Sequence, residues 1–388
     1  MIKKAVFAFF ILLTCYFGNS ALASEAKDQY IVKFKDTSTE AAKNLNIPNR
    51  DITYDFSFGH MSVVKLNESD EKKMRNSDKV EYIIKNREVN RIPESKNVYN
   101  EDYYLPLPYN MKQIQLNKIG YLGLSGKKVK LAILDSGVDS RHQDLKVSNS
   151  FTVFDSGIDG NPYRDPLGHG THIAGIIAAK ENEIGITGIA PNTEIFSGKI
   201  IDHNDKTDTI KLLKGMDWAI KNKVDIINLS LYVTEDNKAV KEALDFAYNK
   251  KNIIIVAAAG NFGNIIGKGD NITFPARYDS VISVASNDIN GERSLFSSTG
   301  PKIDITAPGS DIISTYPPNN YRKMSGTSMA TPHVASAAAL LKEKNPSMSA
   351  SDIRRILINS CEKVHKNNNL YGNGFLRLEN ALTFDYIQ

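Results

Sequence analysis

The chain has 388 residues, of which 41% are hydrophobic and 24% are charged, and its net charge is +4 from 48 basic and 44 acidic side chains. This composition is typical of globular proteins and excludes a largely disordered chain. The small positive excess does not indicate a nucleic-acid partner. The length accommodates one large domain or two to three small ones.

The first residues have the pattern of a secretory signal peptide. Two lysines precede an apolar run over 5–17, and Ala21-Leu22-Ala23 offers a small-residue cleavage site. The run is shorter than the roughly 20 residues that span a bilayer, so a cleaved signal over 1–23 is favoured over an anchor. Cys15 lies in an imperfect lipoprotein box, which leaves a lipid-anchored alternative open. We expect a secreted, extracellular protein with no membrane anchor in its mature form.

After that cleavage Cys361 is the only cysteine, which excludes an intramolecular disulfide.

Residues 27–92 are predicted to form a small α+β unit. Strand-like runs cover 30–34, 61–66 and 80–84, and helix-like segments cover 37–45 and 69–77. Ser69 is the expected N-cap of the second helix, with Lys72 on its exposed side. Few large apolar residues occur here, so the unit is expected to be marginally stable alone.

Residues 87–112 show a change of composition. Pro93, Pro106 and Pro108, with several Asn and Tyr residues, favour an extended connection. We place the first domain boundary here and expect an exposed linker that suits proteolysis.

From Lys127 onward, apolar strands alternate with helix-like segments. The predicted strands are 129–134, 224–229, 253–259 and 281–285, and the predicted helices are 172–179, 209–221 and 239–250. This alternation predicts an α/β fold with a doubly wound, mostly parallel sheet and helices on both faces.

Asp135 and His169 are the first two candidates for chemistry. Asp135 follows the strand 129–134, at the carboxyl end where α/β proteins gather functional groups, although an Asp that only caps a turn is the simpler interpretation. His169 stands between two glycines before a small and apolar stretch, which indicates an imidazole held at a buried helix. His172 leaves a metal pair open, but no Glu lies between the two histidines and no third ligand is evident.

Ser328 and Asn261 are the next candidates. Ser328 lies at the start of a predicted helix, where the helix dipole favours negative charge, and the alternative is a simple N-cap. Asn261 follows the strand 253–259, where its amide can donate to an oxyanion or serve only in a turn. His333, in the same helix as Ser328, is expected to hydrogen-bond within the core.

Together these residues have the types that acyl transfer requires. The Ser328 hydroxyl is a weak nucleophile and needs a base such as His169, and Asp135 would fix the imidazole tautomer and stabilise the imidazolium. The Asn261 side chain and the backbone N–H of Ser328 would hold the oxyanion. A lipase or esterase is not indicated, because the G-x-S-x-G elbow and its Ser, Asp, His order are absent.

Four sequence blocks make the chain resemble the subtilase family of secreted, subtilisin-like serine proteases. They are LAILDSGVD, GHGTHIAG, AAAGN and GTSMATPHVA, and the resemblance covers roughly residues 104–380. It implies a monomeric serine endopeptidase acting on peptides or proteins, either with broad specificity or as a dedicated processing enzyme of the lantibiotic leader-peptidase type. The alternative is a catalytically silent binding protein of the same fold, but all four site residues are present.

The resemblance also implies a domain organisation. The run 30–34 is similar to the first strand of subtilase propeptides. Residues 24–103 would then be a propeptide that acts as chaperone and inhibitor, with its tail in the active site, and residues 104–388 the catalytic domain. The enzyme would remove the propeptide itself by a cut between Glu101 and Tyr104.

Substrate-binding residues follow from the same resemblance. A peptide would add as a strand between two edges, Ser230-Leu231 and 202–209, with Gly260 and residues near Thr273 at the floor of the S1 pocket. Tyr232 stands where the family usually has glycine, which changes the S1 entrance, and Lys268 in a neighbouring loop would admit an acidic P1 side chain. The second edge contains Asp202, Asp205 and Asp208, which either favour basic residues upstream of the cut or form a solvated loop.

A structural calcium ion is implied as well. The ligands matching the family's site are the side chains of Asp144 and Asn182 and the carbonyls of Lys180, Ile184 and Ile186, all oxygen donors of the kind that Ca²⁺ prefers. A further family ligand would fall near Leu105, which has no side-chain oxygen, so weaker binding is expected. A metal-free loop is the alternative.

Overall fold

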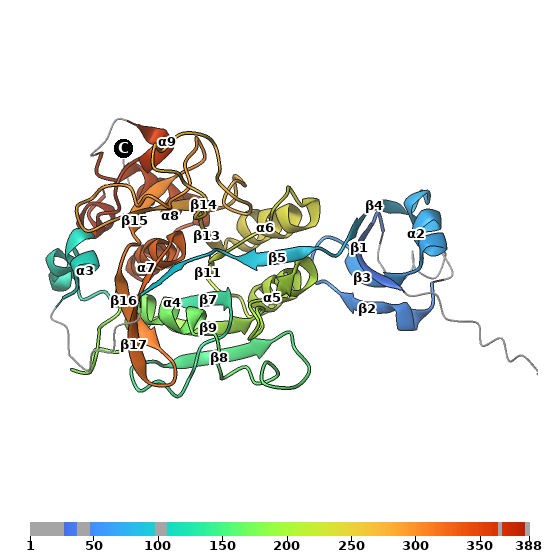
Figure 1. Ribbon diagram of the computed structural model, residues 1–388, viewed down its shortest axis with the longest axis horizontal. Coiled ribbons are helices and arrows are strands. Elements are labelled where there is room, and N and C mark those ends of the chain that lie inside the picture. The colour runs from blue at the N-terminus through green and yellow to red at the C-terminus, as the bar shows by residue number, and fades with distance from the viewer. Residues whose placement is uncertain (1–26, 37–46, 98–106, 364–366, 385–388) are drawn as a thin grey trace, which may run out of the picture.

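The computed structural model of the chain describes residues 27–36, 47–97, 107–363 and 367–384 (Figure 1). The predicted signal peptide 1–23, the predicted helix 37–45, the predicted maturation bond within 101–104, and Leu105 lie outside these residues.

The N-terminal unit is a four-stranded antiparallel sheet with one helix on it. The sheet has the order β2-β3-β1-β4, and its strands are β1 (Asp28–Phe34), β2 (Ile52–Asp55), β3 (Met61–Leu66) and β4 (Val80–Lys85). These strands confirm the α+β prediction. The helix α2 (Glu68–Arg75) begins one residue earlier than predicted. Asn67, not Ser69, is its N-cap, because the Asn67 side chain accepts from the backbone N–H of Asp70.

The central layer of the molecule is a seven-stranded parallel sheet of order β15-β14-β13-β11-β7-β9-β8, which confirms the predicted α/β class. Its strands are β7 (Lys130–Asp135), β8 (Val147–Thr152), β9 (Glu194–Lys199), β11 (Ile226–Leu229), β13 (Ile254–Ala258), β14 (Ile282–Asn287) and β15 (Ile305–Pro308). Successive side chains of β7 enter different cores, Leu131 and Ile133 on one face and Ala132 and Leu134 on the other. A strand buried on both faces must be apolar throughout, as this one is.

Helices cover both faces of this sheet (Figure 1). On one side α4 (His169–Ala178) and α7 (Thr327–Lys344) pack together, and on the other α5 (Thr209–Lys221) packs with α6 (Lys238–Lys251). The smaller elements are α3 (Tyr109–Gln113), α8 (Ala350–Asn359), α9 (Asn368–Tyr371), α10 (Leu378–Leu382), the 3₁₀ helices η1 (Asn49–Asp51), η2 (Leu116–Lys118) and η3 (Gly120–Leu122), and the hairpin β16 (Ile312–Tyr316) with β17 (Asn320–Ser325).

The chain order of the strands reverses between β7 and β11. From β7 the sheet continues through β9 and β8 on one side and through β11 to β15 on the other. A crevice forms outside the carboxyl ends of strands at such a point, and it is the usual ligand position in open α/β sheets. Asp135 is the last residue of β7, and Ser230 directly follows β11.

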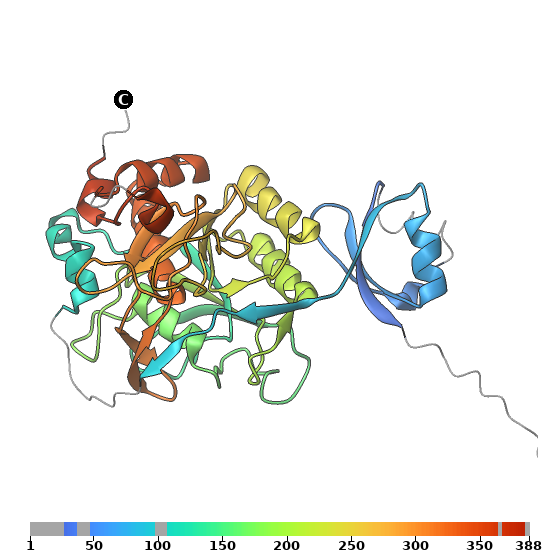
Figure 2. The same cartoon turned by 45° about the horizontal axis from the view of Figure 1, so that its top comes forward.

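The segment 88–97, which we call the strap, runs from the N-terminal unit past α5 and α6 toward the hairpin of β16 and β17 (Figures 1 and 2). Its first half, β5 (Glu88–Arg91), lies between β10 (Thr207–Asp208) and β12 (Leu231–Tyr232), antiparallel to both. Its second half, β6 (Ser95–Asn97), pairs with β17. The prediction of an exposed linker was therefore wrong for this part, because both halves of the strap use their backbone groups in strand pairing.

The N-terminal unit packs against α5 and α6. Ile31, Met61 and Val63 share one core with residues of these helices. The buried carboxylate of Asp217 in α5 accepts hydrogen bonds from the Tyr54 hydroxyl at 2.7 Å and from the backbone N–H of Ser57 at 2.9 Å. The unit gains here the apolar contacts that its own small core lacks.

Gly170 provides a test of how tightly β7 and α4 meet. A Cβ at Gly170 would lie 2.1 Å from the backbone oxygen of Gly137, whereas one at Gly120 would meet nothing within 4 Å. We expect Gly170→Ala to lower the free energy of unfolding by about 1–3 kcal/mol or more, because backbone must move to admit the methyl group. Gly120→Ala should stay within about 0.5 kcal/mol. Thermal unfolding of both variants in a Ser328→Ala background measures the difference, and equal midpoints would contradict this packing.

Candidate active site

Asp135 and His169 meet where β7 ends and α4 begins. The His169 Nδ1 lies 2.7 Å from the Asp135 Oδ1, and both side chains are 1% exposed. The same carboxylate oxygen accepts from the backbone N–H of Ser136 at 2.7 Å. The imidazole is therefore held at one nitrogen by a fixed carboxylate, and its Nε2 faces the crevice.

The start of α4 is held by residues that the sequence analysis missed. Asp165 accepts from the N–H of Gly168 at 2.8 Å and from the N–H and hydroxyl of Thr171 at 2.8 and 2.7 Å. The Ser136 hydroxyl accepts from the N–H of Gly170 at 3.0 Å, which ties the end of β7 to the same turn. Asp165 is fully buried, and desolvation raises its pKa. Asp165 lies four residues before the first residue of α4, and an acidic residue close to a helix start is a signal that could have identified it.

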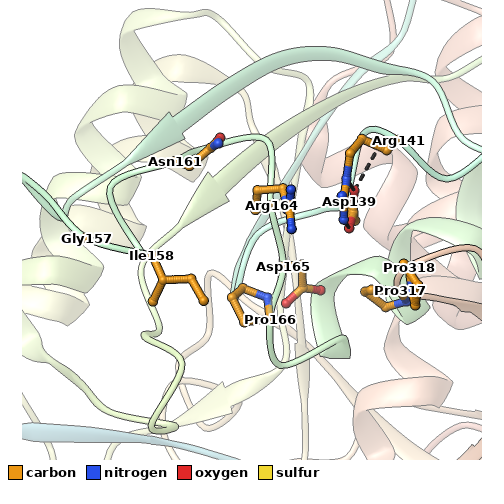
Figure 3. A pocket seen from close by; sticks show the side chains of 10 residues that line it. All are labelled: Asp139, Arg141, Gly157, Ile158, Asn161, Arg164, Asp165, Pro166, Pro317 and Pro318. Carbon is orange, nitrogen blue, oxygen red and sulfur yellow. Dashed lines mark hydrogen bonds and ion pairs between the residues drawn. The ribbon is translucent and has the colours of Figure 1, made fainter.

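A hollow opens next to this helix start (Figure 3). Its lining is Asp139, Arg141, Gly157, Ile158, Asn161, Arg164, Asp165, Pro166, Pro317 and Pro318. Asp139 is paired with Arg141 through its carboxylate, and its backbone N–H donates to the Thr171 hydroxyl at 3.0 Å. The hollow thus lies beside the supports of His169 and does not contain His169 itself.

Ser328 is the second residue of α7, and Gly326 holds the cap position, so Ser328 is not the N-cap. Its hydroxyl is buried and has no hydrogen-bond partner among the described residues. The N–H of Ser328 lies in the first turn of α7, where backbone N–H groups lack a partner within the helix and the helix dipole is positive. Its carbonyl accepts from the Ser230 hydroxyl at 3.3 Å, which links α7 to the end of β11.

The Asn261 side chain has a fixed orientation. Its Oδ1 accepts from the N–H and the hydroxyl of Thr327, both at 2.9 Å, which leaves Nδ2 as the outward donor. Nδ2 lies 2.6 Å from the carbonyl oxygen of Pro93 in the strap. A peptide carbonyl is thus bound by the amide that was predicted to hold an oxyanion.

Glu94 of the strap occupies the free nitrogen of His169. Its Oε1 lies 2.6 Å from the His169 Nε2, and its side chain is fully buried. Burial alone would lower the pKa of His169, but the charges of Asp135 and Glu94 outweigh it and raise that pKa to about 10. Burial likewise opposes ionisation of Glu94, and its contacts with His169 and Arg91 prevail and lower its pKa. The pair is an ionic contact between a carboxylate and an imidazolium.

The predicted substrate-binding residues lie near the strap and the start of α7, where the N–H of Gly260 donates to the Thr327 hydroxyl at 3.2 Å. Leu231 pairs with Arg91 of the strap, and Ser230 precedes it at the end of β11. Gly260 has a φ of 116°, and a Cβ there would lie 2.8 Å from the Ser298 hydroxyl and 3.2 Å from Thr273. A side chain at residue 260 would therefore clash with these neighbours, which favours glycine at this position.

Tyr232, expected at the S1 entrance, and Lys268, expected in a neighbouring loop, have the following contacts. The ring of Tyr232 packs edge-on against Phe262, with 5.1 Å between centroids. Lys268 is exposed, and the Asn264 side chain bonds its backbone.

The residues predicted to bind calcium lie near one another. Asp144 is buried: its Oδ2 accepts from the N–H of Ile186 and the hydroxyl of Tyr321, and its Oδ1 has no partner among the described residues. The Asn182 Oδ1 accepts from the N–H of Ile184 at 3.1 Å, and the N–H of Lys180 donates to the Asp144 carbonyl at 2.8 Å. Desolvation raises the pKa of Asp144. An unpartnered buried carboxylate oxygen fits a cation.

Two other histidines have structural partners. His172 turns its Nε2 to the carbonyls of Ile312 and Arg322, at 3.0 and 2.9 Å, and not toward a metal shared with His169. His333 contacts Asn110 and the Met329 carbonyl in the core, as expected, and burial lowers its pKa to about 4. No cluster of three or more His, Cys, Asp or Glu side chains suited to a metal occurs within the described ranges.

Comparison with known proteins identifies relatives along nearly the whole chain. A family model described as the subtilase family matches residues 126–374. Subtilisin E of Bacillus subtilis (strain 168) is 34% identical over 385 residues, 97% of either chain. A thermostable alkaline protease of Halalkalibacterium halodurans is 35% identical over 94% of this chain and 95% of its own. Subtilisin DY of Bacillus licheniformis is 40% identical over 276 residues, 71% of this chain and 98% of its own.

Proposed function

The chain belongs to the subtilase family of serine endopeptidases, and we propose that Asp135, His169 and Ser328 are its catalytic residues, with Asn261 as an oxyanion donor. The single observation that carries this assignment is the Pro93 carbonyl, which the Asn261 amide binds in the same crevice that holds His169. A peptide carbonyl at this donor supports the assignment, because the oxyanion of acyl transfer develops from such a carbonyl.

The mechanism follows from these positions. The Ser328 hydroxyl attacks the scissile carbonyl while the His169 Nε2 takes its proton. The oxyanion accepts from the Asn261 Nδ2 and from the backbone N–H of Ser328. His169 then protonates the leaving amine, and water hydrolyses the acyl-enzyme by the reverse transfers. Asp135 holds the Nδ1 proton and stabilises the imidazolium throughout.

We further propose that residues 24–103 form an inhibitory propeptide, that the chain is secreted after loss of residues 1–23, and that the enzyme removes the propeptide itself. Three contacts support inhibition by the strap: its strand pairing on both sides of the centre, the Pro93 carbonyl on Asn261, and Glu94 on the His169 Nε2. An imidazolium held by two carboxylates has no free nitrogen to accept the Ser328 proton. Two roles suit such an enzyme, processing of a dedicated precursor and broad extracellular proteolysis.

A structural calcium ion is part of the proposal. Asp144 and Asn182 would hold it with the carbonyls of Lys180, Ile184 and Ile186, and the unpartnered Asp144 Oδ1 supports this assignment. When bound, the ion would neutralise a buried carboxylate and stabilise the loop after α4; it takes no part in peptide hydrolysis.

Self-cleavage is tested by the N-terminal sequence of the secreted protein. We expect wild type to begin within residues 102–104 and Ser328→Ala to retain the whole segment from residue 24, because triad members act as a unit. Ser347→Ala, which changes an exposed serine, should mature like wild type. A Ser328→Ala protein cut at the same bond would contradict self-cleavage. A mature wild-type protein that begins at Glu94 would show that the cleaved bond lies within the strap.

The contact between Glu94 and His169 predicts an alkaline shift in maturation. The charges of Asp135 and Glu94 together raise the His169 pKa from 6.5 to about 10, so the stabilisation that the charged imidazole contributes is complete below pH 6.5 and is lost as pH rises toward 10. The Glu94 pKa is lowered from 4.5, so its share is complete above pH 4.5 and is lost as pH falls through the lowered value.

We therefore expect wild-type maturation to accelerate from pH 6.5 toward pH 10. Glu94→Gln removes one of the two charges that raise the His169 pKa and leaves that of Asp135, and its profile should move about one pH unit toward acid. Glu88→Gln, an exposed strap residue, is the control. The rate of precursor loss on gels between pH 6 and 10 measures both, and coincident profiles for wild type and Glu94→Gln would refute the contact's role.

Calcium binding is tested by thermal unfolding of the mature enzyme inhibited at Ser328. Calcium at 100 times its dissociation constant should stabilise the fold by about 2.7 kcal/mol, and a chelator should remove the gain. Asp144→Asn should abolish the calcium-dependent shift, whereas Glu379→Gln, at a surface ion pair, should keep it. An unfolding midpoint that calcium does not move in wild type would exclude the site.

A further inference from the structure

The three carboxylates of the loop at 202–208 have different partners. The Asp202 Oδ1 accepts from the N–H groups of Asn204 and Lys206, at 2.9 and 2.8 Å, and so closes the turn. The Asp208 side chain accepts from the N–H of Lys211 at 2.9 Å and caps α5. Asp205, between them, directs its carboxylate at the strap. The interpretation of this edge as a merely solvated loop therefore fails at Asp205.

Asp205 binds Arg91 of the strap through two parallel hydrogen bonds. The Arg91 Nε lies 2.9 Å from the Asp205 Oδ1, and the Nη2 lies 2.9 Å from the Oδ2. The Arg91 side chain is only 7% exposed, whereas that of Asp205 is 39% exposed. Such a two-point contact requires a planar guanidinium, and lysine cannot reproduce it.

Strand pairing determines where this arginine lies. Arg91 is opposite Leu231 on β12, and Val89 is opposite Thr207 on β10, so the backbone of β5 brings Arg91 to Asp205. An extended peptide bound to the same two edges would place one of its side chains here. Among the described residues Arg91 is the only ion-pair partner of Asp205, so loss of the strap leaves a carboxylate at the cleft without that cation.

We propose that Asp205 is a specificity residue that selects peptide substrates with an arginine on the N-terminal side of the cleaved bond, in the place of Arg91. This rests on the proposed function, because it assumes that substrates bind along the strap's path. A carboxylate at a cleft edge favours arginine over neutral side chains and disfavours acidic ones, which gives selection by attraction and by repulsion.

Arg87, which directly precedes the strap, supplies a matched comparison. Arg87 pairs with Glu235 beyond β12, and these side chains are 58% and 66% exposed. Exposed ion pairs contribute little because water and salt screen them. Removal of the Glu235 charge should therefore affect arginine selection far less than removal of the Asp205 charge, although each carboxylate pairs with an arginine of the same stretch of chain.

The experiment uses mature enzyme made from the full chain and extended peptides. In each peptide one of the four positions before the cleaved bond is Arg, Lys, Gln or Glu, and mass spectrometry identifies the bond. We expect wild type to prefer Arg over Gln at one position by about 10- to 100-fold in kcat/KM, with Lys between them and Glu lowest. Asp205→Asn should reduce that ratio to about threefold or less, and Glu235→Gln should keep it.

Asparagine suits the backbone at this position, because residue 205 has a φ of 63°, which Asn and Asp accept more readily than most side chains. Thermal unfolding of Asp205→Asn checks that the fold is intact. The proposal is overturned if wild type shows no Arg preference at any of the four positions. It also fails if Asp205→Asn keeps the preference, or if Glu235→Gln reduces it equally. An enzyme that cleaves none of the peptides and resists fluorophosphonate labelling would instead overturn the proposed function.

Discussion

The interaction on which the rest of the structure depends is the buried contact of His169 with two carboxylates. Asp135 lies 2.7 Å from Nδ1 and Glu94 lies 2.6 Å from Nε2, and all three side chains are at most 1% exposed. Two acceptors on one ring require both nitrogens to carry protons. A charge this far from water persists only when it is paired, so the strap and the central sheet stabilise each other's ionised groups. Departure of Glu94 frees the nitrogen that proton transfer needs.

The scaffold holds that imidazole by bonds that leave it little freedom. β7 is buried on both faces, and its last residue is Asp135, so the position of the carboxylate follows from the sheet. Asp165 and Ser136 bind the first N–H groups of α4, which orients the helix that carries His169. A site built on rigid elements with its own supporting hydrogen bonds keeps its geometry within fractions of an ångström. The absence of a side chain at Gly170 allows the two elements to approach this closely.

Features that arise from local sequence could be predicted, and those that arise from distant contacts could not. The strands of the parallel sheet are continuous apolar runs, and Asp135, His169, Asn261 and Ser328 lie in short motifs at strand or helix ends. The N-cap of α2 was misplaced by two residues, because Asn67 and Ser69 are both good caps and only geometry decides. Glu94 and its partner are 75 residues apart and Arg91 and its partner 114, and nothing in the proline-containing segment indicates either contact.

Two different residues of the strap account for recognition and for inhibition. Arg91 is bound by Asp205, which belongs to the enzyme and remains after the strap leaves, so that contact is available to any peptide with an arginine in the same place. Glu94 acts on His169 itself, and a substrate gains nothing from a carboxylate there. The Arg91 guanidinium also lies 3.1 Å from the Glu94 carboxylate. The same side chain therefore contacts both Asp205 at the cleft edge and the carboxylate that binds His169. A peptide that keeps the arginine and lacks the glutamate would therefore bind along the strap's path while leaving His169 free to act as a base.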